Sequence, residues 1–568
     1  MVWIMLKKIV LLCLLNFFAY AQDLPVSFVD NHAIGSDELY SALDLHRPYF
    51  YEFWKKPPTI DTKTTNLVIN RLKNFYKSKG FYHSFITVKQ SDKMIEFHIK
   101  EKKPIIVSTI SVLSKFDLSS YIPFEKGVRF QSDLFEKSKK DIKIFYKNRG
   151  FCKVNLDAKA WIDIEKNRAY LAYDVRQNPL CHFGDIKIVK PKDIDEKIIK
   201  SLLYFKKGDL YSLKKLKESY KSFYAHSGIS SVMIKSDMQQ GFDIDTTVKV
   251  DETKKPIRFQ VGGGVNSDKG LELALGVKNR NFYGNLKTVG FSIKYTPLKD
   301  SLSVDMSMPL QKRRTVGGMS EYSDEKFLGY KERKFLSTIY IKQRRVRTIL
   351  QGAMLFDYSR ISDSDDLLTY SQGDFFIVSP KISWIYDSRD DPLEPTSGYL
   401  LRAEVMGSLK SVVSDASYYK YNLEAAYILP FLPSVMAFKV DYGSIHVEDG
   451  SLPASYRFYA GGMSSNRAYS YRKLGPTNAY GDPLGLNSVL NFTAEYRFGI
   501  YGDIGGILFS DDTYIGIKDS PDFSKLYSSF GFGIRYKTPI GPIALDFGFD
   551  TKEPMKQYAF HFRIGELF

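Results

Sequence analysis

The sequence predicts a string of α+β repeats followed by an all-β transmembrane barrel of about 16 antiparallel strands. Three observations support this fold class: a short apolar segment of the export type at the start, helices that end at glycine in the first half, and strict alternation of apolar with small or charged residues in the second half. Alternation with period two gives each strand two different faces. A barrel with lipid outside and water inside requires such a pair of faces.

Residues 1–21 are predicted to form a signal peptide. Lys7 and Lys8 supply the basic start, an apolar run follows, and residues 19–21 read Ala-Tyr-Ala, the small-x-small pattern of a cleavage site. The apolar run is too short to favour a membrane-spanning helix. We therefore expect an exported protein.

The chain is basic, with a formal net charge of +17, most of it before residue 257. A basic surface often indicates nucleic acid, but export argues against a nucleic-acid partner. An anionic membrane surface, acidic client segments or a plain solvated surface are the alternatives that remain.

Two cysteines, Cys152 and Cys181, remain after cleavage of the predicted signal peptide. In an oxidising compartment they can form a disulfide. Two buried or free thiols are equally compatible with the sequence, so both alternatives stay open.

An internal repeat organises the first half of the chain. A Phe-Tyr pair, three further residues and a glycine recur in residues 74–81, 144–151 and 222–229. Each copy is expected to close an amphipathic helix, with the glycine as a left-handed stop. Two short strands and a proline follow each time, which gives a module of roughly 75 residues with one strand, two helices and two strands. The predicted boundaries are 22–104, 105–180 and 181–256 for the modules and 257–568 for the barrel.

In the second half, helical periodicity gives way to alternation. Near the C-terminus, Phe530, Phe532 and Ile534 alternate with Gly531 and Gly533. Lipid cannot satisfy the open edge of a sheet, so such strands must close on themselves. At roughly 20 residues per strand and connection, this segment gives about 16 strands. The 39 tyrosines and 41 phenylalanines of the chain suit the aromatic girdles of a barrel.

Several motifs then carry a family resemblance. They are the repeat, residues 457–469 (Arg-Phe-Tyr-Ala-Gly-Gly-Met-Ser-Ser-Asn-Arg-Ala-Tyr) followed by Gly475-Pro476, residues 387–392, and the closing segments 531–536, 538–542 and 546–548. With them the chain resembles the outer-membrane barrel assembly and translocation proteins typified by BamA and TamA. That family has tandem POTRA domains in the periplasm and a 16-stranded barrel in the bacterial outer membrane. Three modules at this length are most similar to TamA.

Residues 457–469 resemble the inward-folded loop of this family, whose hallmark is Val/Ile-Arg-Gly-Phe/Tyr. The hallmark positions are Gly461, Gly462, Asn466, Ala468 and Tyr469. Asn466 replaces the aliphatic residue and Ala468 replaces the glycine, so we expect a different geometry at the tip. The resemblance implies that Arg467 reaches two acidic residues of the inner wall. They are Glu495, which faces the lumen by alternation, and Asp511. The alternative is that Arg467 lies in a solvated pore.

The resemblance implies a factor that inserts or secretes β-barrel or autotransporter-like clients by strand addition at a lateral seam between the first and last strands. The seam residues are expected to be Gly262, Gly263, Gly264, Phe560, Phe562 and Phe568. Glycines weaken strand pairing. The implied partners are unfolded outer-membrane proteins, a TamB-like periplasm-spanning protein and outer-membrane lipid, with no nucleic acid. The alternatives are a general assembly factor, a dedicated two-partner-type secretion transporter and a passive outer-membrane pore.

No enzyme chemistry is indicated by the sequence. The glycines of residues 262–264 precede a strand and not a helix, unlike a nucleotide-binding fingerprint. Asp363, Asp365 and Asp366 are interleaved with serines, which is typical of a solvated loop. We therefore expect no catalytic residues, no cofactor and no metal.

Overall fold

The computed structural model describes residues 23–45, 57–238, 241–311, 313–392, 394–431, 434–536, 538 and 543–564. The predicted signal peptide and Phe568 lie outside these residues. The chain divides into two compact units. The first comprises residues 1–184, 208–213 and 237–244, and the second comprises residues 185–207, 214–236 and 245–568.

The first α+β module has a four-stranded sheet in the order β2-β1-β4-β3. Its elements are β1 (Asp23–Val29), α2 (Ser36–Ala42), β2 (Thr59–Asp61), η1 (Thr62–Thr64), α3 (Thr65–Ser78), β3 (Phe85–Gln90) and β4 (Ile95–Lys100). Leu72 and Tyr76 of α3 lie four residues apart and are fully buried, because helical spacing puts them on one face. That face packs into the apolar core of the module.

The second module has a three-stranded sheet in the order β5-β7-β6. Its elements are β5 (Ile106–Leu113), η2 (Ser119–Tyr121), α4 (Ser132–Lys147), β6 (Asn155–Asp163) and β7 (Arg168–Arg176). The first of the two predicted helices is only the short 3₁₀ turn η2, and Pro123 follows it closely. Proline lacks the backbone N–H that a continuing helix needs.

The third module is built from β8 (His182–Val189), α5 (Glu196–Leu202), α6 (Leu213–Tyr224), β9 (Ile229–Ser236) and β10 (Asp243–Glu252). Its sheet order is β8-β10-β9. Here both predicted helices form. None of the helices within the described ranges is long and apolar enough to cross a bilayer.

The three repeat glycines do not share one role. Gly80 and Gly150 follow α3 and α4 with φ angles of +91° and +96°, as expected for a left-handed stop. Gly228 has no positive φ, and the stop predicted there is wrong. A Cβ at Gly228 would lie 2.5 Å from the carbonyl oxygen of Arg280, so this glycine permits a close backbone approach instead.

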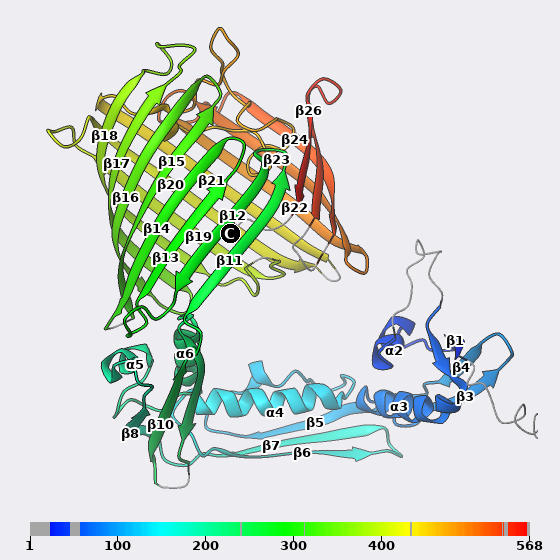
Figure 1. Cartoon of the computed structure of the whole chain (residues 1–568). Helices are drawn as coiled ribbons and strands as arrows, with labels where there is room; N and C mark the ends of the chain where they lie inside the picture. The colour runs from blue at the N-terminus through cyan, green and yellow to red at the C-terminus, as the bar shows by residue number, and fades with distance from the viewer. Residues whose placement is uncertain are drawn as a thin grey trace, which may run out of the picture. The chain divides into compact units, whose positions relative to one another are not determined.

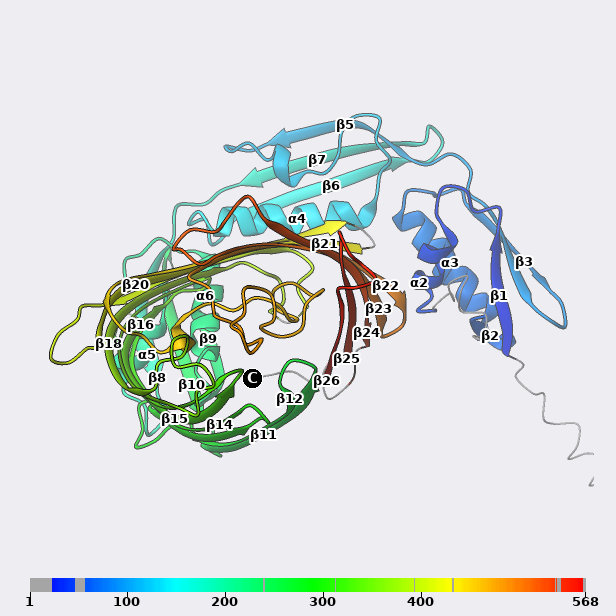
Figure 2. The same ribbon diagram turned by 90° about the horizontal axis from the view of Figure 1, so that it is seen from above.

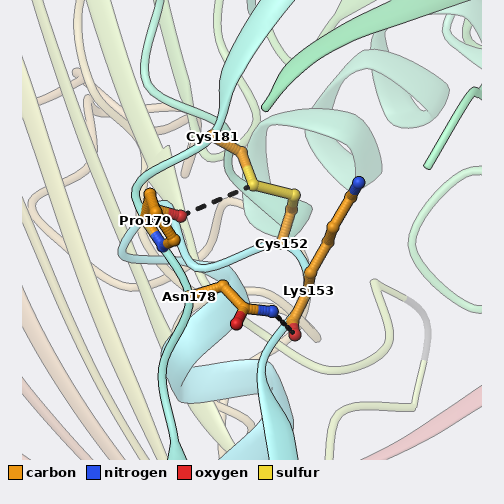
Figure 3. The surroundings of a disulfide bond; sticks show 5 residues. All are labelled: Cys152, Lys153, Asn178, Pro179 and Cys181. Carbon is orange, nitrogen blue, oxygen red and sulfur yellow. Dashed lines mark hydrogen bonds between the residues drawn. A yellow bond between two sulfur atoms is a disulfide. The ribbon is translucent and has the colours of Figure 1, made fainter. Parts of the chain in front are cut away.

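Cys152 and Cys181 form a disulfide, with their Cα atoms 5.9 Å apart. Figure 3 shows the bond between the segment that follows α4 and the segment that precedes β8. The Cys181 N–H donates to the Gly150 carbonyl at 2.8 Å, and the Asn178 side-chain amide donates to the Lys153 carbonyl at 2.8 Å. Of the two alternatives that the sequence left open, the structure has the disulfide.

The second half closes into an antiparallel barrel in which each strand pairs with the next in sequence from β11 to β26 (Figure 1). This confirms the predicted 16-stranded barrel. The strands are β11 (Ile257–Asn266), β12 (Gly270–Asn279), β13 (Thr288–Tyr295), β14 (Lys299–Leu310), β15 (Arg314–Phe327), β16 (Tyr330–Arg344), β17 (Thr348–Ser362), β18 (Gly373–Asp387), β19 (Gly398–Ser408), β20 (Ala416–Phe431), β21 (Ser434–Gly450), β22 (Ser488–Tyr501), β23 (Ile504–Gly516), β24 (Leu526–Tyr536), β25 (Ile543–Asp550) and β26 (Tyr558–Ile564).

The barrel strands have an apolar outer face and a polar inner face. On β24, Phe530 and Phe532 are 50% and 48% exposed, whereas Ser529 and the glycines between the aromatics are buried. Phe532 stacks on Phe547 of β25 with ring centroids 5.4 Å apart. Such aromatic pairs across neighbouring strands stabilise the lipid-facing surface.

Candidate functional site: the inward loop and the seam

A long segment, residues 451–487, connects β21 to β22 and lies inside the ring of strands (Figure 2). We call it the inward loop. It folds back on itself: the Gly462 N–H donates to the Tyr469 carbonyl at 2.9 Å, and the Leu474 N–H donates to the Ala460 carbonyl at 3.0 Å. Gly461 and Gly462 have φ angles of +94° and +100°, which glycine adopts without strain.

Arg467, near the tip of the loop, is 3% exposed and binds two carboxylates of the barrel wall. Its Nε and Nη2 atoms donate to the two carboxylate oxygens of Asp511 on β23, each at 2.8 Å. Its Nη1 donates to Glu495 on β22 at 2.8 Å, and its backbone N–H donates to Asp511 at 3.1 Å. The structure therefore brings together the three residues Arg467, Glu495 and Asp511. Bidentate bonds of this kind fix a guanidinium in orientation as well as in position.

Further residues surround Arg467 that the sequence analysis did not identify. The guanidinium carbon lies 3.5 Å from the ring centroid of Phe509, and Nη1 lies 3.8 Å from Asp546 on β25. Asp546 is also paired with Arg535 on β24 at 2.5 and 2.9 Å. The alternation of β25 could have identified Asp546 from the sequence, because it puts this carboxylate on the face opposite Phe547.

The hallmark positions next to Arg467 pack against the same wall. Asn466 is fully buried, and its amide donates to the Tyr527 carbonyl at 3.1 Å. Ala468 is fully buried and has no positive φ. The Tyr469 hydroxyl donates to Asp550 at 2.8 Å.

Gly548 on β25 makes room for the backbone of the loop tip. A Cβ at this position would overlap the carbonyl group of Arg467 and lie 2.8 Å from the Ala468 nitrogen. On either side, the amide of Gln557 donates to the Ala468 carbonyl at 2.7 Å, and His561 Nε2 lies 3.0 Å from the Arg467 carbonyl. The last hairpin of the barrel is thus shaped to receive the loop.

A second anchor holds the start of the inward loop on a different part of the wall. The Tyr456 hydroxyl donates to Asp357 on β17 at 2.8 Å, and the Ser455 hydroxyl donates to Glu332 on β16 at 2.9 Å. Lys334 lies 3.1 Å from Glu332 and 3.5 Å from Asp357. Sequence reasoning missed this group because the contributing segments lie far apart along the chain and belong to no motif.

The seam joins the first barrel strand to the last, and the structure describes β26 as far as Ile564. Strand β11 pairs with β12 along its whole length. With β26, the described register consists of two pairs, Val265↔Ile564 and Asn266↔Arg563.

The predicted seam residues differ in which neighbouring strand they contact. Phe562 lies opposite Ser267, because the Ser267 N–H donates to the Phe562 carbonyl at 2.8 Å. Phe560 belongs to the same strand and pairs with Phe547 of β25. A Cβ at Gly264 would lie 2.5 Å from the Ile564 carbonyl oxygen. Gly262 and Gly263 have no partner on β26 in the described part of that strand.

Separation of this seam would expose the edge of β11. An unpaired strand edge presents N–H and C=O groups that another strand can pair with. The loop, fixed at two places on the wall, occupies the lumen beside that edge.

Comparison with known proteins gives a family context. The Omp85 superfamily domain matches residues 256–568. The POTRA family, described as a surface antigen variable number repeat, matches residues 103–178 and 182–253. The outer membrane protein assembly factor BamA of Nitratidesulfovibrio vulgaris is 20% identical over 465 residues, which are 77% of this chain and 58% of that protein.

Two solved structures show the same fold. BamA from Haemophilus ducreyi lacking POTRA domains 1–3 aligns with a TM-score of 0.58 at 15% identity, over 81% of this chain and 99% of the other. CdiB from Escherichia coli aligns with a TM-score of 0.50 at 12% identity, over 88% of this chain and 96% of the other.

Proposed function

Because the chain belongs to the Omp85 superfamily, we propose that it is an assembly factor that inserts or secretes β-barrel or autotransporter-like clients. Its barrel lies in the outer membrane, and its POTRA domains lie in the periplasm. The relative from N. vulgaris is an assembly factor by name. The chain spans 58% of the length of that relative.

The observation that carries the proposal is the seam between β11 and β26, for which two register pairs are described. The described register ends at Val265↔Ile564, so the edge of β11 from Ile257 to Gly264 lies outside it. A client strand adds to this edge through backbone hydrogen bonds, and the folding free energy of the client drives insertion. Gly262 and Gly263 lower the cost of separating the edge because they contribute little side-chain packing.

The periplasmic modules offer further edges to clients. In the second module, β5 and β6 are the outer strands of the sheet. We propose that such edges receive unfolded outer-membrane proteins and a TamB-like periplasm-spanning partner, while outer-membrane lipid surrounds the barrel. Among Omp85 roles, a specialised TamA-type role suits three tandem modules.

Depletion of the protein tests the function. Heat-modifiable gel mobility scores which outer-membrane barrels still fold. Loss of a subset such as autotransporters supports the TamA-type role, and loss of nearly all barrels makes the protein a general assembly factor. Unchanged barrel content overturns the assembly proposal and leaves a dedicated secretion transporter or a passive pore.

A cross-link tests the seam itself. Val265→Cys with Ile564→Cys joins β11 to β26 at a register pair. Val277→Cys with Phe291→Cys joins β12 to β13, which are already paired, and serves as the matched control. Sealing the seam should stop client assembly, whereas the control cross-link should not. Full activity of the sealed protein would exclude strand addition at this place.

The fold likeness to CdiB favours one second candidate, a dedicated secretion transporter. In that case depletion removes a single secreted protein from the cell surface or medium and leaves folded barrels unchanged. The same depletion experiment, with the secreted fraction analysed as well, separates the two candidates.

A further inference from the structure

His561 on β26 connects three parts of the barrel that lie far apart in the sequence. It is 2% exposed. Its Nε2 lies 3.0 Å from the Arg467 carbonyl of the inward loop, and its Nδ1 lies 3.3 Å from Asp268 and 3.3 Å from the Ser267 hydroxyl in the β11–β12 turn. A carbonyl oxygen only accepts hydrogen bonds, so Nε2 is the donor to the loop.

The β11–β12 turn is held in shape to meet this histidine. The Asn266 side-chain oxygen accepts from the backbone N–H groups of Asp268 at 3.0 Å and Lys269 at 2.7 Å. The second carboxylate oxygen of Asp268 accepts from the Met463 N–H of the inward loop at 3.0 Å. Asp268 therefore contacts both the last strand and the loop.

Side chains and one backbone bond extend the closure of the seam beyond the two register pairs that are described. The Ser267 N–H donates to the Phe562 carbonyl at 2.8 Å, and the Phe562 N–H donates to the Ser267 hydroxyl at 3.3 Å. Because β11 begins at Ile257, directly after the third periplasmic module in the chain, this cluster lies at the opposite, extracellular end of the seam.

We propose that Ser267, Asp268 and His561 form a latch that closes the extracellular end of the seam and couples it to the inward loop. The inference rests on the proposed function, because it assumes that the seam opens. Displacement of the loop removes two partners of the latch at once, the Arg467 carbonyl from His561 and the Met463 N–H from Asp268. A client that displaces the loop thereby weakens the seam. The three residues are positioning residues and contact no client in this scheme.

The test uses the full-length protein in liposomes with the cysteine pair Val265→Cys and Ile564→Cys. The fraction of seam cross-link formed in a fixed time is measured by mass spectrometry of the linked peptides. Asp268→Asn and His561→Gln should each lower this fraction severalfold, because the two strands spend more time apart. Arg467→Ala should do the same if the loop is coupled to the latch. Asp300→Asn, at an exposed carboxylate of β14 on the next hairpin, is the matched control and should change nothing.

Heat-modifiable mobility confirms that each variant is folded, and Ser267→Ala provides a milder variant should the others fold poorly. Equal cross-linking in all the folded latch variants and in the parent would overturn the latch. The Val277→Cys and Phe291→Cys pair must stay unaffected throughout, since a general loosening of the barrel would lower cross-linking there too. The proposed function fails separately, when a sealed seam leaves client assembly intact. If the latch variants cross-link normally and the sealed protein is inactive, the latch is rejected and the proposed function is retained.

Discussion

At the scale of single residues, one guanidinium and one glycine help to position the tip of the inward loop. Arg467 satisfies Asp511 and Glu495 at the same time, and both acids are largely shielded from water. Gly548 leaves the space that the Arg467 carbonyl occupies. Arg467 holds the loop through its own side chain, and Gly548 makes room for the backbone carbonyl of Arg467. Because both act at the same position of the loop, loss of either residue should have related consequences.

Arg467→Ala should destabilise the barrel by about 3–5 kcal/mol, because it leaves buried carboxylates without their cation. Arg467→Lys should restore only part of this, since an ammonium group cannot make the paired bonds to Asp511. The midpoint of the heat-modifiable gel shift measures the effect. Arg402→Ala removes a more exposed partner of Glu424 and should cost at most about 1 kcal/mol. Equal shifts for Arg467→Ala and Arg402→Ala would contradict the prediction.

Gly548→Ala should displace the loop tip, because the added methyl group overlaps the Arg467 carbonyl. Overpacking of this kind costs about 1–3 kcal/mol. Protease sensitivity of the loop in intact cells and the midpoint of the gel shift are the measurements. Gly352→Ala on β17 is the control, because a Cβ there meets nothing within 4 Å. A loop that stays protected in Gly548→Ala would argue that the tip can rearrange without loss.

At the scale of elements, two connections in the α+β modules carry testable chemistry. The disulfide joins the end of α4 to the start of β8, across a sequence separation of 29. In the third module, His226 follows α6, and burial together with the nearby cations Arg344 and Lys342 lowers its pKa to about 4. Reductant should break the disulfide, and acid should weaken the packing around His226.

Protein that lacks residues 1–21, when denatured, should show no reactive thiol until reductant is added, because Cys152 and Cys181 are paired. Replacing both with alanine should destabilise the local structure by about 2–4 kcal/mol. Limited proteolysis of the full chain, with cleavage sites between residues 150 and 182 identified by mass spectrometry, measures this loss. Free thiols in protein purified without reductant would refute the pairing.

The third module should lose stability as the pH falls. The pKa of His226 is about 4 in the folded chain and about 6.5 in the unfolded chain, so the unfolded chain binds more protons between these values. The contribution of His226 is therefore fully present above pH 6.5 and decreases toward pH 4. Hydrogen exchange of the α6 amides at pH 7 and pH 5, corrected for intrinsic rates, measures the change. His226→Gln should show a weaker pH dependence, and an identical dependence in both proteins would exclude His226 as the cause.

At the scale of the whole molecule, the barrel has one face for lipid and one for the loop. Adjacent residues on β14 illustrate this division: Val304 is 42% exposed on the outer face, and the Ser303 hydroxyl pairs with that of Ser292 at 2.8 Å on the inner face. The orientation of the strands therefore decides which substitutions the membrane tolerates.

Val304→Lys should reduce barrel folding, because a lysine on the lipid face costs about 2–4 kcal/mol near the middle of the bilayer. Ser303→Lys, one residue earlier on the same strand, should fold nearly as well as the parent because the charge enters the lumen. The folded fraction in lipid vesicles, scored by heat-modifiable mobility, compares them. The opposite order of the two variants would mean that the barrel faces are assigned the wrong way round.

The sequence predicted what depends on local pattern and missed what depends on register and long-range contact. Alternation predicted the closed barrel and the lumenal side of Glu495, and the resemblance identified Arg467 and Asp511. The register between β11 and β26 could not be predicted from the sequence, because the hydrogen bonds of the β11–β12 turn decide that Phe562 lies opposite Ser267. The Glu332–Lys334–Asp357 group was missed because its carboxylates meet only when β16 and β17 pair. Gly228 shares the repeat motif but closely approaches the backbone of Arg280, and no local sequence pattern predicts this contact.

The two anchors of the inward loop have a mechanical consequence. Tyr456 is tied to β17 and Arg467 to β22 and β23, so the loop spans the cross-section of the ring like a brace. A closed sheet of strands flattens easily under uneven lateral pressure from the bilayer, and a brace raises its stiffness against that deformation. When the seam separates, the ring becomes a curved open sheet, and the brace helps to preserve its curvature. As long as the brace stays attached at both ends, the opened wall keeps the radius that allows it to close again.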